Sequence, residues 1–259
     1  MMSISHIQML RTMLRDEKGI ILPGAPNALA ARIIADLGFK AVYLTGAGLT
    51  NTHLGLPDLG FMDLSQVVDH VMAIRCVIDL PLIVDIDTGF GNAINVTHTV
   101  RILEQAGASA IQIEDQHAPK RCGHFDGKEL IPPEEMVGKV RAAVDSRRQD
   151  LVVIARTDAC AVEGFEAAIE RAGRYIEAGA DVTFVEAPES LEDLKAVSRR
   201  LKAPQLVNMV LGGKTPDCRR KSGGRNGVQL GALRQRRLAR SRAWHAVDAG
   251  DAQGEGRPQ

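Results

Sequence analysis

The sequence predicts an α/β protein with a (β/α)8 TIM-type barrel, and three observations support that fold class. Short apolar runs alternate with amphipathic segments of helical period along the first 217 residues. Several helical segments end at a glycine that comes a few residues before the next apolar run. The expected strands are almost entirely apolar, which is typical of a parallel sheet covered by helices. Strict alternation at this number of units favours a closed barrel over an open doubly wound sheet.

The strands are expected, in order, at Ile20–Leu22, Ala41–Leu44, Leu82–Asp85, Ala110–Ile113, Leu151–Ala155, Val182–Val185 and Gln205–Asn208. The helices are expected between them at Asn27–Leu37, Asp63–Ile78, Ile94–Gln105, Pro133–Arg147, Gly164–Ala178 and Leu191–Leu201. Asn27 is a suitable N-cap, and Pro133 followed by two glutamates is a good helix start. The helices are expected to close at Gly38, Gly107 and Gly179. Met9 and Met13, at helical spacing, predict an N-terminal helix that caps the barrel.

An eighth strand is not evident after Asn208. The chain from Cys218 onward is rich in Arg, Ala and Gly, and it contains no β-branched run of four residues. We therefore expect a barrel catalytic domain at 1–217 that lacks its eighth strand and C-terminal helices, followed by an atypical basic tail at 218–259. The tail has the composition of a disordered segment or of a frameshifted reading of GC-rich DNA. The alternative is a genuine basic appendage that binds an acidic partner.

Composition and charge exclude several classes of protein. The chain holds 32 basic and 32 acidic residues, and a net charge of zero argues against binding to nucleic acid or a membrane surface. The balance is uneven, because residues 1–217 hold 22 basic and 29 acidic residues and residues 218–259 hold 10 and 3. No run of 18 apolar residues predicts a membrane span. Four widely spaced cysteines suggest neither a disulfide framework nor a zinc ribbon, and a cytoplasmic location is expected. Cys76 is expected in the core, and Cys160 is expected to have a packing role.

Polar residues follow almost every expected strand, at the end of the barrel where active sites form. The set comprises Thr45, Gly46, Asp85, Asp87, Glu114, Asp115, Arg156, Thr157, Asp158, Glu186 and Asn208. A single acid in such a place is most often a helix cap or a solvated loop residue, but a ring of acids with one arginine and one asparagine favours a site. Buried carboxylates need a cation or hydrogen-bond donors to stay charged. Asp85, Asp87 and Glu114 therefore predict a site for a hard metal ion, and Mg²⁺ is the ion that we expect. Arg156 suits a substrate carboxylate, which it grips with two hydrogen bonds.

The long connection Gln116–Ile131 is the second candidate feature. It contains the run Lys120, Arg121, Cys122, Gly123 and His124. Cations and a histidine beside a cysteine lower the pKa of the thiol and make it a competent proton donor or base. The alternative is a solvated basic loop with an incidental cysteine.

Residues 20–217 resemble the isocitrate lyase/phosphoenolpyruvate mutase superfamily. The resemblance rests on six stretches, which are Leu54–Gly60, Asp85–Asn92, Ile113–Gln116, Lys120–His124, Ala155–Asp158 and Gly213–Pro216. The Lys-Arg-Cys-Gly-His run is similar to the signature of the family's lyases. Within the family the chain looks most like the methylisocitrate lyase, dimethylmalate lyase and carboxyphosphonoenolpyruvate phosphonomutase group. Thr45 stands where methylisocitrate lyases usually have serine, which leaves the exact substrate open.

The resemblance implies a role for each matched residue. It makes Asp85 the principal Mg²⁺ ligand, with Mn²⁺ as a possible replacement, and it gives the water shell of the metal to Asp58, Asp87 and Glu114. It implies that the substrate is bound by Tyr43, Thr45, Gly46, Ala47, Arg156, Glu186 and Asn208. The catalytic loop residues that it implies are Lys120, Arg121, Cys122 and His124, with Cys122 transferring the proton at carbon.

The activity that the resemblance implies is Mg²⁺-dependent cleavage of a carbon–carbon bond in a small 2-hydroxy di- or tricarboxylate of the 2-methylisocitrate or dimethylmalate type. Three alternatives stay open, which are a carboxyphosphonoenolpyruvate phosphonomutase, an oxaloacetate decarboxylase, and an inactive truncated barrel. The expected partner is a small carboxylate substrate, with neither nucleic acid nor membrane. The family forms homo-oligomers through C-terminal helices, and the resemblance ends at about Pro216, before those helices.

Overall fold

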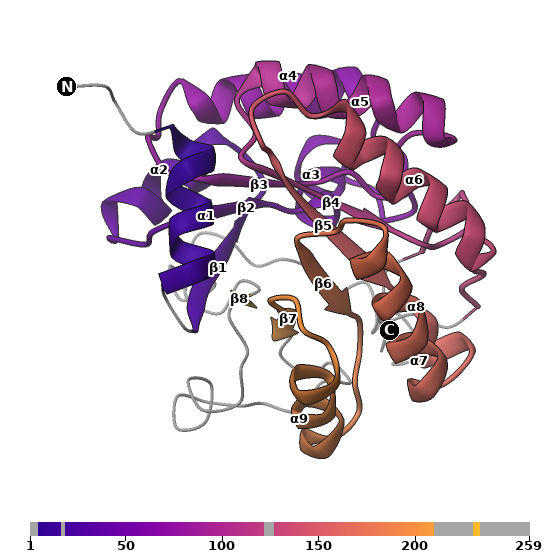
Figure 1. Ribbon diagram of the computed structural model, residues 1–259. Helices are drawn as coiled ribbons and strands as arrows, with labels where there is room; N and C mark the ends of the chain where they lie inside the picture. The colour runs from indigo at the N-terminus through magenta and orange to yellow at the C-terminus, as the bar shows by residue number, and fades with distance from the viewer. Residues whose placement is uncertain (1–4, 17–18, 122–126, 210–229, 234–259) are drawn as a thin grey trace, which may run out of the picture.

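The computed structural model describes residues 5–16, 19–121, 127–209 and 230–233. In this part of the chain, parallel strands curl into a barrel with helices packed around the outside (Figure 1). The strands are β1 Ile20–Ala25, β2 Val42–Leu44, β3 Leu82–Asp85, β4 Ala110–Glu114, β5 Val152–Thr157, β6 Val182–Val185, β7 Leu206–Met209 and β8 Leu230–Leu233. The helices are α1 His6–Asp16, α2 Ala28–Asp36, α3 Gly46–His53, α4 Leu64–Arg75, α5 Ala93–Ala106, α6 Pro133–Ser146, α7 Ala159–Val162, α8 Phe165–Glu177 and α9 Leu191–Arg200. The predicted barrel class is confirmed.

The sheet runs in the order β6-β5-β4-β3-β2-β1-β8-β7. Its two ends meet near Thr183, which forms a parallel bridge with Gln205. The backbone N–H of Thr183 donates to Pro204 O at 3.0 Å, and its hydroxyl donates to Gln205 Oε1 at 2.9 Å. These bonds join the first and last strands of the sheet.

The expectation that the eighth strand is missing is wrong. Strand β8 lies between β1 and β7 and is parallel to both, with Leu230 opposite Ile20 and Leu206. Its sequence, Leu-Gly-Ala-Leu, has no β-branched residue, but strand formation depends strongly on context. The edges of β1 and β7 present unpaired backbone groups that a neighbouring segment satisfies by pairing. The rest of the expected tail, and any C-terminal helices, lie outside the described residues.

Side chains alternate between the inside and the outside of the barrel along each strand. The inner cluster includes Ile83, Ile154 and Phe184, whereas the outer cluster, under the helices, includes Val84 and Val153. This alternation follows from the two-residue repeat of a strand. It decides which residues at the strand ends face the barrel interior.

Helix α1 closes one end of the barrel, as predicted for the N-terminal helix. Its buried residues Leu10, Met13 and Leu14 belong to the same cluster as the inner strand residues. Burying an aliphatic side chain contributes roughly 1.5–3 kcal/mol, so three such residues anchor the helix firmly. The opposite end of the barrel is left for polar residues.

Helix boundaries follow the local signals in the sequence. Asn27 caps α2, and the predicted glycines Gly38, Gly107 and Gly179 all have positive φ. At Gly107 a side chain would also collide with Arg75, because an added Cβ would lie 2.7 Å from its side-chain carbons. Helix α3 was not expected from the sequence. It begins after Thr45, whose hydroxyl accepts from Gly48 N at 3.3 Å.

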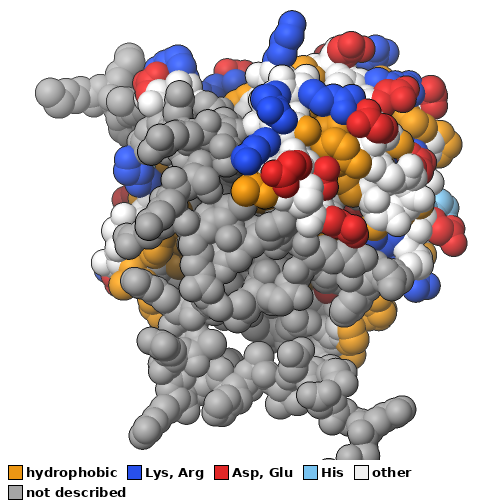
Figure 2. All heavy atoms as spheres, turned by 90° about the horizontal axis from the view of Figure 1, so that it is seen from below, with side chains coloured by type: hydrophobic (Ala, Val, Ile, Leu, Met, Phe, Trp, Pro, Cys, Tyr) orange, Lys and Arg blue, Asp and Glu red, His pale blue; other side chains and the backbone are white. Residues whose placement is uncertain are grey.

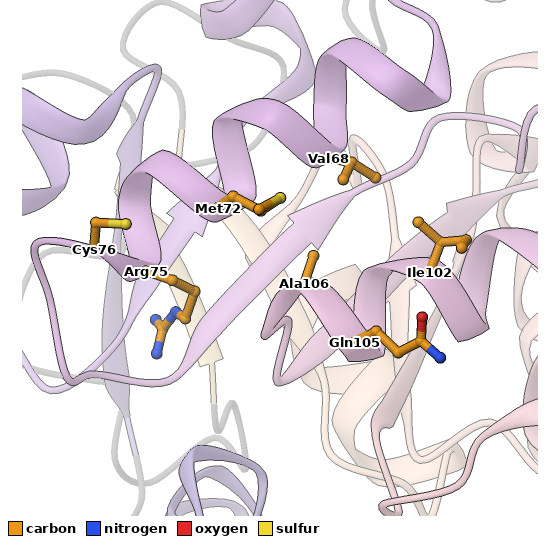
Figure 3. Close-up of a pocket in the computed structure, with 7 residues that line it drawn as sticks. All are labelled: Val68, Met72, Arg75, Cys76, Ile102, Gln105 and Ala106. Carbon is orange, nitrogen blue, oxygen red and sulfur yellow. The ribbon is translucent and has the colours of Figure 1, made fainter.

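Cys76 is exposed, so its expected place in the core is wrong, whereas Cys160 is half-buried and packs against the α7–α8 cluster. Cys76 is the C-cap of α4, where the chain leaves the helix and its apolar face no longer sets the direction of the side chain. It lines a hollow between α4 and α5 together with Val68, Met72, Arg75, Ile102, Gln105 and Ala106 (Figure 3). The hollow lies at the C-terminal ends of these helices and therefore away from the carboxyl ends of the strands.

Basic and acidic side chains are intermixed on the described part of the face seen in Figure 2. The described part of that face therefore presents charges of both signs. None of the helices in the described part of the chain is long and apolar enough to cross a membrane.

Candidate active site

The predicted site residues continue the inner face of the barrel. Ile83 and Ile154 point inward, and Asp85 and Arg156 come two residues later on the same strands. Gln112, Glu114, Glu186 and Asn208 occupy equivalent places on β4, after β6 and on β7. The two-residue repeat therefore brings acids and an arginine together at the carboxyl end of the barrel.

Asp85 is held by a polar network at this end. Its Oδ1 accepts from Gln112 Nε2 at 3.2 Å and from Asp87 N at 3.2 Å. Its Oδ2 accepts from Gly46 N, at the start of α3, at 3.4 Å. The side-chain oxygen of Gln112, Oε1, accepts a hydrogen bond from the hydroxyl of Tyr43 at 2.7 Å. Both side chains are buried and come from β2 and β4, the strands on either side of β3, so Tyr43 holds Gln112 and Gln112 holds the Asp85 carboxylate.

Lys120 lies inside the acidic cluster. Its ammonium is 2.5 Å from Asp58 Oδ1 and 2.9 Å from Asp87 Oδ1, and the lysine is 5% exposed. Burial lowers the pKa of Lys120, but the surrounding carboxylates outweigh it and raise that pKa above its ordinary value. Burial raises the pKa of Asp87 to about 6, although Lys120 opposes the rise.

Arg156 is surrounded by three carboxylates. Asp158 binds it with two hydrogen bonds, from Nε at 2.9 Å and from Nη2 at 3.1 Å. Glu114 Oε2 lies 3.2 Å from Nε, and Glu186 Oε2 lies 3.6 Å from Nη1. The guanidinium also stacks 5.1 Å from the centre of the Phe184 ring.

The charges around Arg156 are strongly coupled. Burial alone would lower the pKa of Arg156, but the three carboxylates raise it well above its ordinary value. Burial raises the pKa of Glu114 well above its usual range, and Arg156 only partly offsets this. Asp158 differs, because Arg156 and Lys128 outweigh its burial and lower its pKa to about 2. The Arg156–Asp158 pair is therefore charged at neutral pH.

A second buried hydrogen-bond network, centred on Asp115, holds the backbone of Asp158 in place. Asp115 accepts from Asp158 N at 3.0 Å, from the hydroxyl of Thr157 at 2.7 Å and from the hydroxyl of Tyr175 at 2.7 Å. Arg171 also approaches Asp115, at 3.4 Å. Asp115 thus ties the ends of β4 and β5 to α8.

The residues fit a hard divalent cation in chemistry, although Lys120 lies in their midst. Among the described residues, no group of three or more His, Cys, Asp or Glu side chains is spaced to hold a metal ion. Asp85 and Asp87 nevertheless converge on Gly46, where an added Cβ would lie 3.0 Å from Asp87 Oδ1 and 3.2 Å from Asp85 Oδ2. Glu114 Oε1 is buried without a hydrogen-bond partner in the described part of the chain. An all-oxygen set of this kind is what Mg²⁺ prefers.

The structure brings most of the predicted site residues to one end of the barrel. Thr45 and Ala47 are buried at the start of α3, and Asn208 is half-buried on β7. Arg121 is exposed, and its backbone is tied to the Gln116 side chain by two hydrogen bonds of 2.9 Å. Cys122 and His124 lie outside the described residues, so their predicted roles stay predictions.

Sequence reasoning missed three residues of the cluster. Gln112 had a signal, since it is a lone polar residue between two isoleucines on an otherwise apolar strand. Asp158 was visible at the end of β5 but was not assigned to the site. Lys128, whose ammonium lies 2.9 Å from Asp158 Oδ1, had no signal, because a single lysine in a loop is ordinarily solvated.

Comparison with known proteins places the chain in a family. The family described as phosphoenolpyruvate phosphomutase matches residues 10–236. A 2-methylisocitrate lyase of Aeropyrum pernix is 53% identical over 207 residues, which are 80% of this chain and 67% of that relative. A 2,3-dimethylmalate lyase of Eubacterium barkeri is 47% identical over 208 residues, which are 80% of this chain and 72% of the relative.

Solved structures give the same result. A structure of oxaloacetate acetylhydrolase with 3,3-difluorooxalacetate has a TM-score of 0.86 and 36% identity, over 91% of this chain and 82% of the other. A structure of 2,3-dimethylmalate lyase has a TM-score of 0.85 and 35% identity, over 89% of this chain and 79% of the other. The barrel, the acidic cluster and these relatives agree, and the chain belongs to the phosphoenolpyruvate mutase/isocitrate lyase superfamily, among its carbon–carbon lyases.

Proposed function

We propose that this chain is a Mg²⁺-dependent lyase that cleaves a small 2-hydroxy di- or tricarboxylate, of the 2-methylisocitrate or dimethylmalate type, in the cytoplasm. The observation that carries the proposal is the convergence of Asp85, Asp87 and Glu114 with Arg156 at one end of the barrel. This arrangement offers oxygen ligands to a cation and a guanidinium to a carboxylate at the same end of the barrel. The relatives named 2-methylisocitrate lyase and 2,3-dimethylmalate lyase support the choice of substrate class.

In this proposal, Asp85 would be the principal residue that holds Mg²⁺, and Asp58, Asp87 and Glu114 would complete its site. When bound, Mg²⁺ supplies Lewis-acid stabilisation of negative charge on substrate oxygen. Gln112 and Gly46 orient the Asp85 carboxylate by the hydrogen bonds described above. Lys120 favours the charged form of Asp87 until the cation binds, and its ammonium also contacts Asp58.

Arg156 binds the carboxylate of the substrate part that becomes the α-keto acid. Its charge is secured by the surrounding acids, and the Phe184 ring limits its movement. At the start of α3, the Thr45 side chain and the N–H of Ala47 bind a second carboxylate, since the N–H of Gly46 already donates to Asp85. As the 2-hydroxyl gives up its proton to solvent, its oxygen forms the new keto group and the electron pair of the broken carbon–carbon bond stays on the leaving carboxylate fragment. The Cys122 thiol then protonates the resulting carbanion.

The test is incubation of the purified chain with Mg²⁺ and a panel of 2-hydroxy di- and tricarboxylates, with the 2-keto acid product trapped as its phenylhydrazone. We expect 2-keto acid from 2-methylisocitrate or 2,3-dimethylmalate, and none after removal of Mg²⁺ by chelation. A chain that forms no 2-keto acid from any member of the panel contradicts the proposal.

The similarity to oxaloacetate acetylhydrolase, at a TM-score of 0.86, favours a second candidate, which is hydrolytic cleavage of oxaloacetate. Oxaloacetate is therefore included in the panel. Formation of oxalate and acetate would favour this hydrolase, and release of CO₂ would favour a decarboxylase.

A further inference from the structure

We propose that Lys128 and Asp158 are positioning residues for Arg156, and that Lys128 acts by neutralising Asp158 so that Arg156 accepts an anionic substrate. The inference rests on the proposed function in one respect only, the binding of a carboxylate by Arg156. The contacts among these three residues carry the argument.

Asp158 sets the orientation of the guanidinium. It receives two hydrogen bonds from Arg156, which fixes both the position and the plane of the group. Residue 158 is itself held by Asp115, which accepts from its backbone N–H at 3.0 Å. The clamp on Arg156 is therefore attached to the rigid ends of β4 and β5.

This clamp has an electrostatic cost. Asp158 stands beside Glu114 and Glu186, so Arg156 already faces three carboxylates before any substrate arrives. A substrate carboxylate adds another negative charge beside these buried groups, where burial weakens solvent screening. An uncompensated Asp158 would therefore oppose the binding that its geometry prepares.

Lys128 supplies the compensation. Its ammonium lies 2.9 Å from Asp158 Oδ1, and the side chains of Lys128 and Asp158 are 1% and 0% exposed. Burying a lysine is costly unless it is paired with an opposite charge, which Asp158 supplies. Lys128 Nζ and Arg156 Nη2 both donate to Asp158 Oδ1. The positive charge of Lys128 therefore offsets the negative charge of Asp158 at the same oxygen that binds the guanidinium.

The test uses oxalate, a small dicarboxylate, as a binding probe that needs no turnover. Oxalate affinity in the presence of Mg²⁺ is measured by isothermal titration calorimetry for the full chain, Lys128→Gln, Asp158→Asn and the double variant. We expect Lys128→Gln to weaken oxalate binding about tenfold or more. In the Asp158→Asn background, Lys128→Gln is expected to weaken oxalate binding by less than about threefold, because Lys128 acts through Asp158.

Two further variants control for folding and for charge. Arg147→Gln removes a cation from another partly buried ion pair, in which Arg147 lies 2.7 Å from Asp181. This pair is away from the carboxyl ends of the strands, so oxalate affinity is expected to stay unchanged. Lys128→Arg keeps the charge and stays informative if Lys128→Gln does not fold by circular dichroism. Its oxalate affinity is expected to remain within about threefold of the unaltered chain, and a tenfold loss would contradict the charge role.

The remaining outcomes separate this inference from the proposed function. An equal effect of Lys128→Gln with and without Asp158 would overturn it, since Lys128 would then act directly on the ligand. Failure of the unaltered chain to bind oxalate would also overturn it, because Arg156 would not be a carboxylate receptor. A chain that binds oxalate with the expected pattern, yet cleaves no hydroxy acid, would support the positioning role and reject the lyase.

Discussion

The ammonium of Lys120 lies 2.9 Å from Asp87 Oδ1, within the carboxylates that we propose hold Mg²⁺. The chain thus carries its own cation in this cluster, and the same ammonium also pairs with Asp58. A lysine and a divalent ion a few ångströms apart repel one another, so they compete for the same carboxylates.

Replacement of Lys120 by methionine is therefore expected to strengthen divalent cation binding by about tenfold at pH 8, where the carboxylates are ionised. Turnover is expected to fall at the same time if Lys120 also acts in catalysis. Mn²⁺ binding followed by electron paramagnetic resonance gives the affinity independently of turnover. Unchanged or weaker Mn²⁺ binding in Lys120→Met would show that the lysine does not compete with the metal.

Asp87 makes the stability of the metal-free protein depend on pH. Its pKa is about 6 in the folded state, against 3.8 as its ordinary value, because of burial. The folded protein therefore binds this proton more tightly than the unfolded chain, and the resulting stabilisation is complete below pH about 4 and lost as the pH rises through about 6. Urea unfolding at pH 5 and pH 7.5, with chelator present, is expected to show this loss for the unaltered chain and a smaller one for Asp87→Asn.

Arg156→Lys tests the need for a planar guanidinium. Lysine keeps the charge but loses the paired hydrogen bonds to Asp158 and the stacking on Phe184. We expect KM for the substrate to rise by ten- to a hundredfold, which corresponds to about 1–3 kcal/mol. Steady-state kinetics on the substrate found in the panel measures the change. A KM within twofold of the unaltered value would mean that Arg156 contributes charge alone.

Cys122→Ser tests the proton donor that the resemblance implies. Turnover is expected to be lost, since a hydroxyl is a far weaker acid than a thiol, while Mg²⁺ affinity stays within about twofold. Cys160→Ser is the matched control. Burial raises the pKa of the half-buried Cys160 thiol to about 12, so this cysteine is expected to be dispensable for turnover. Full activity in Cys122→Ser would remove that residue from the mechanism.

The sequence predicted the barrel and the place of Asp85, Glu114 and Arg156 because both depend on a local repeat. Once a strand is recognised, its two-residue alternation determines which residues at its end face the interior. The same reasoning needs no knowledge of distant contacts. It therefore located the acids and the arginine without identifying what holds them.

Two other features could not be predicted in this way. Lys128 becomes a site residue only because folding buries it against Asp158, 30 positions later in the chain. Strand β8 forms from a segment with low strand propensity because its neighbours on both sides supply backbone partners. In both cases the decisive interaction is tertiary, and no local pattern records it.

The two tyrosines of the chain allow a matched test of how Asp85 is oriented. Tyr43 donates to Gln112 Oε1 and Tyr175 donates to Asp115 Oδ2, both at 2.7 Å, and both side chains are buried. Replacing either by phenylalanine leaves a buried acceptor without that donor and is expected to cost about 1–3 kcal/mol of unfolding free energy.

Only Tyr43→Phe is expected to weaken Mg²⁺ binding, by about three- to tenfold, because Gln112 also donates to Asp85 Oδ1 at 3.2 Å and loses its anchor. Urea unfolding and calorimetric Mg²⁺ titration of the two variants measure stability and affinity separately. If Tyr175→Phe weakened Mg²⁺ binding as much as Tyr43→Phe, general loosening of the barrel would explain both results. If neither variant weakened it, the Tyr43–Gln112 pair would have no part in holding Asp85 for the metal.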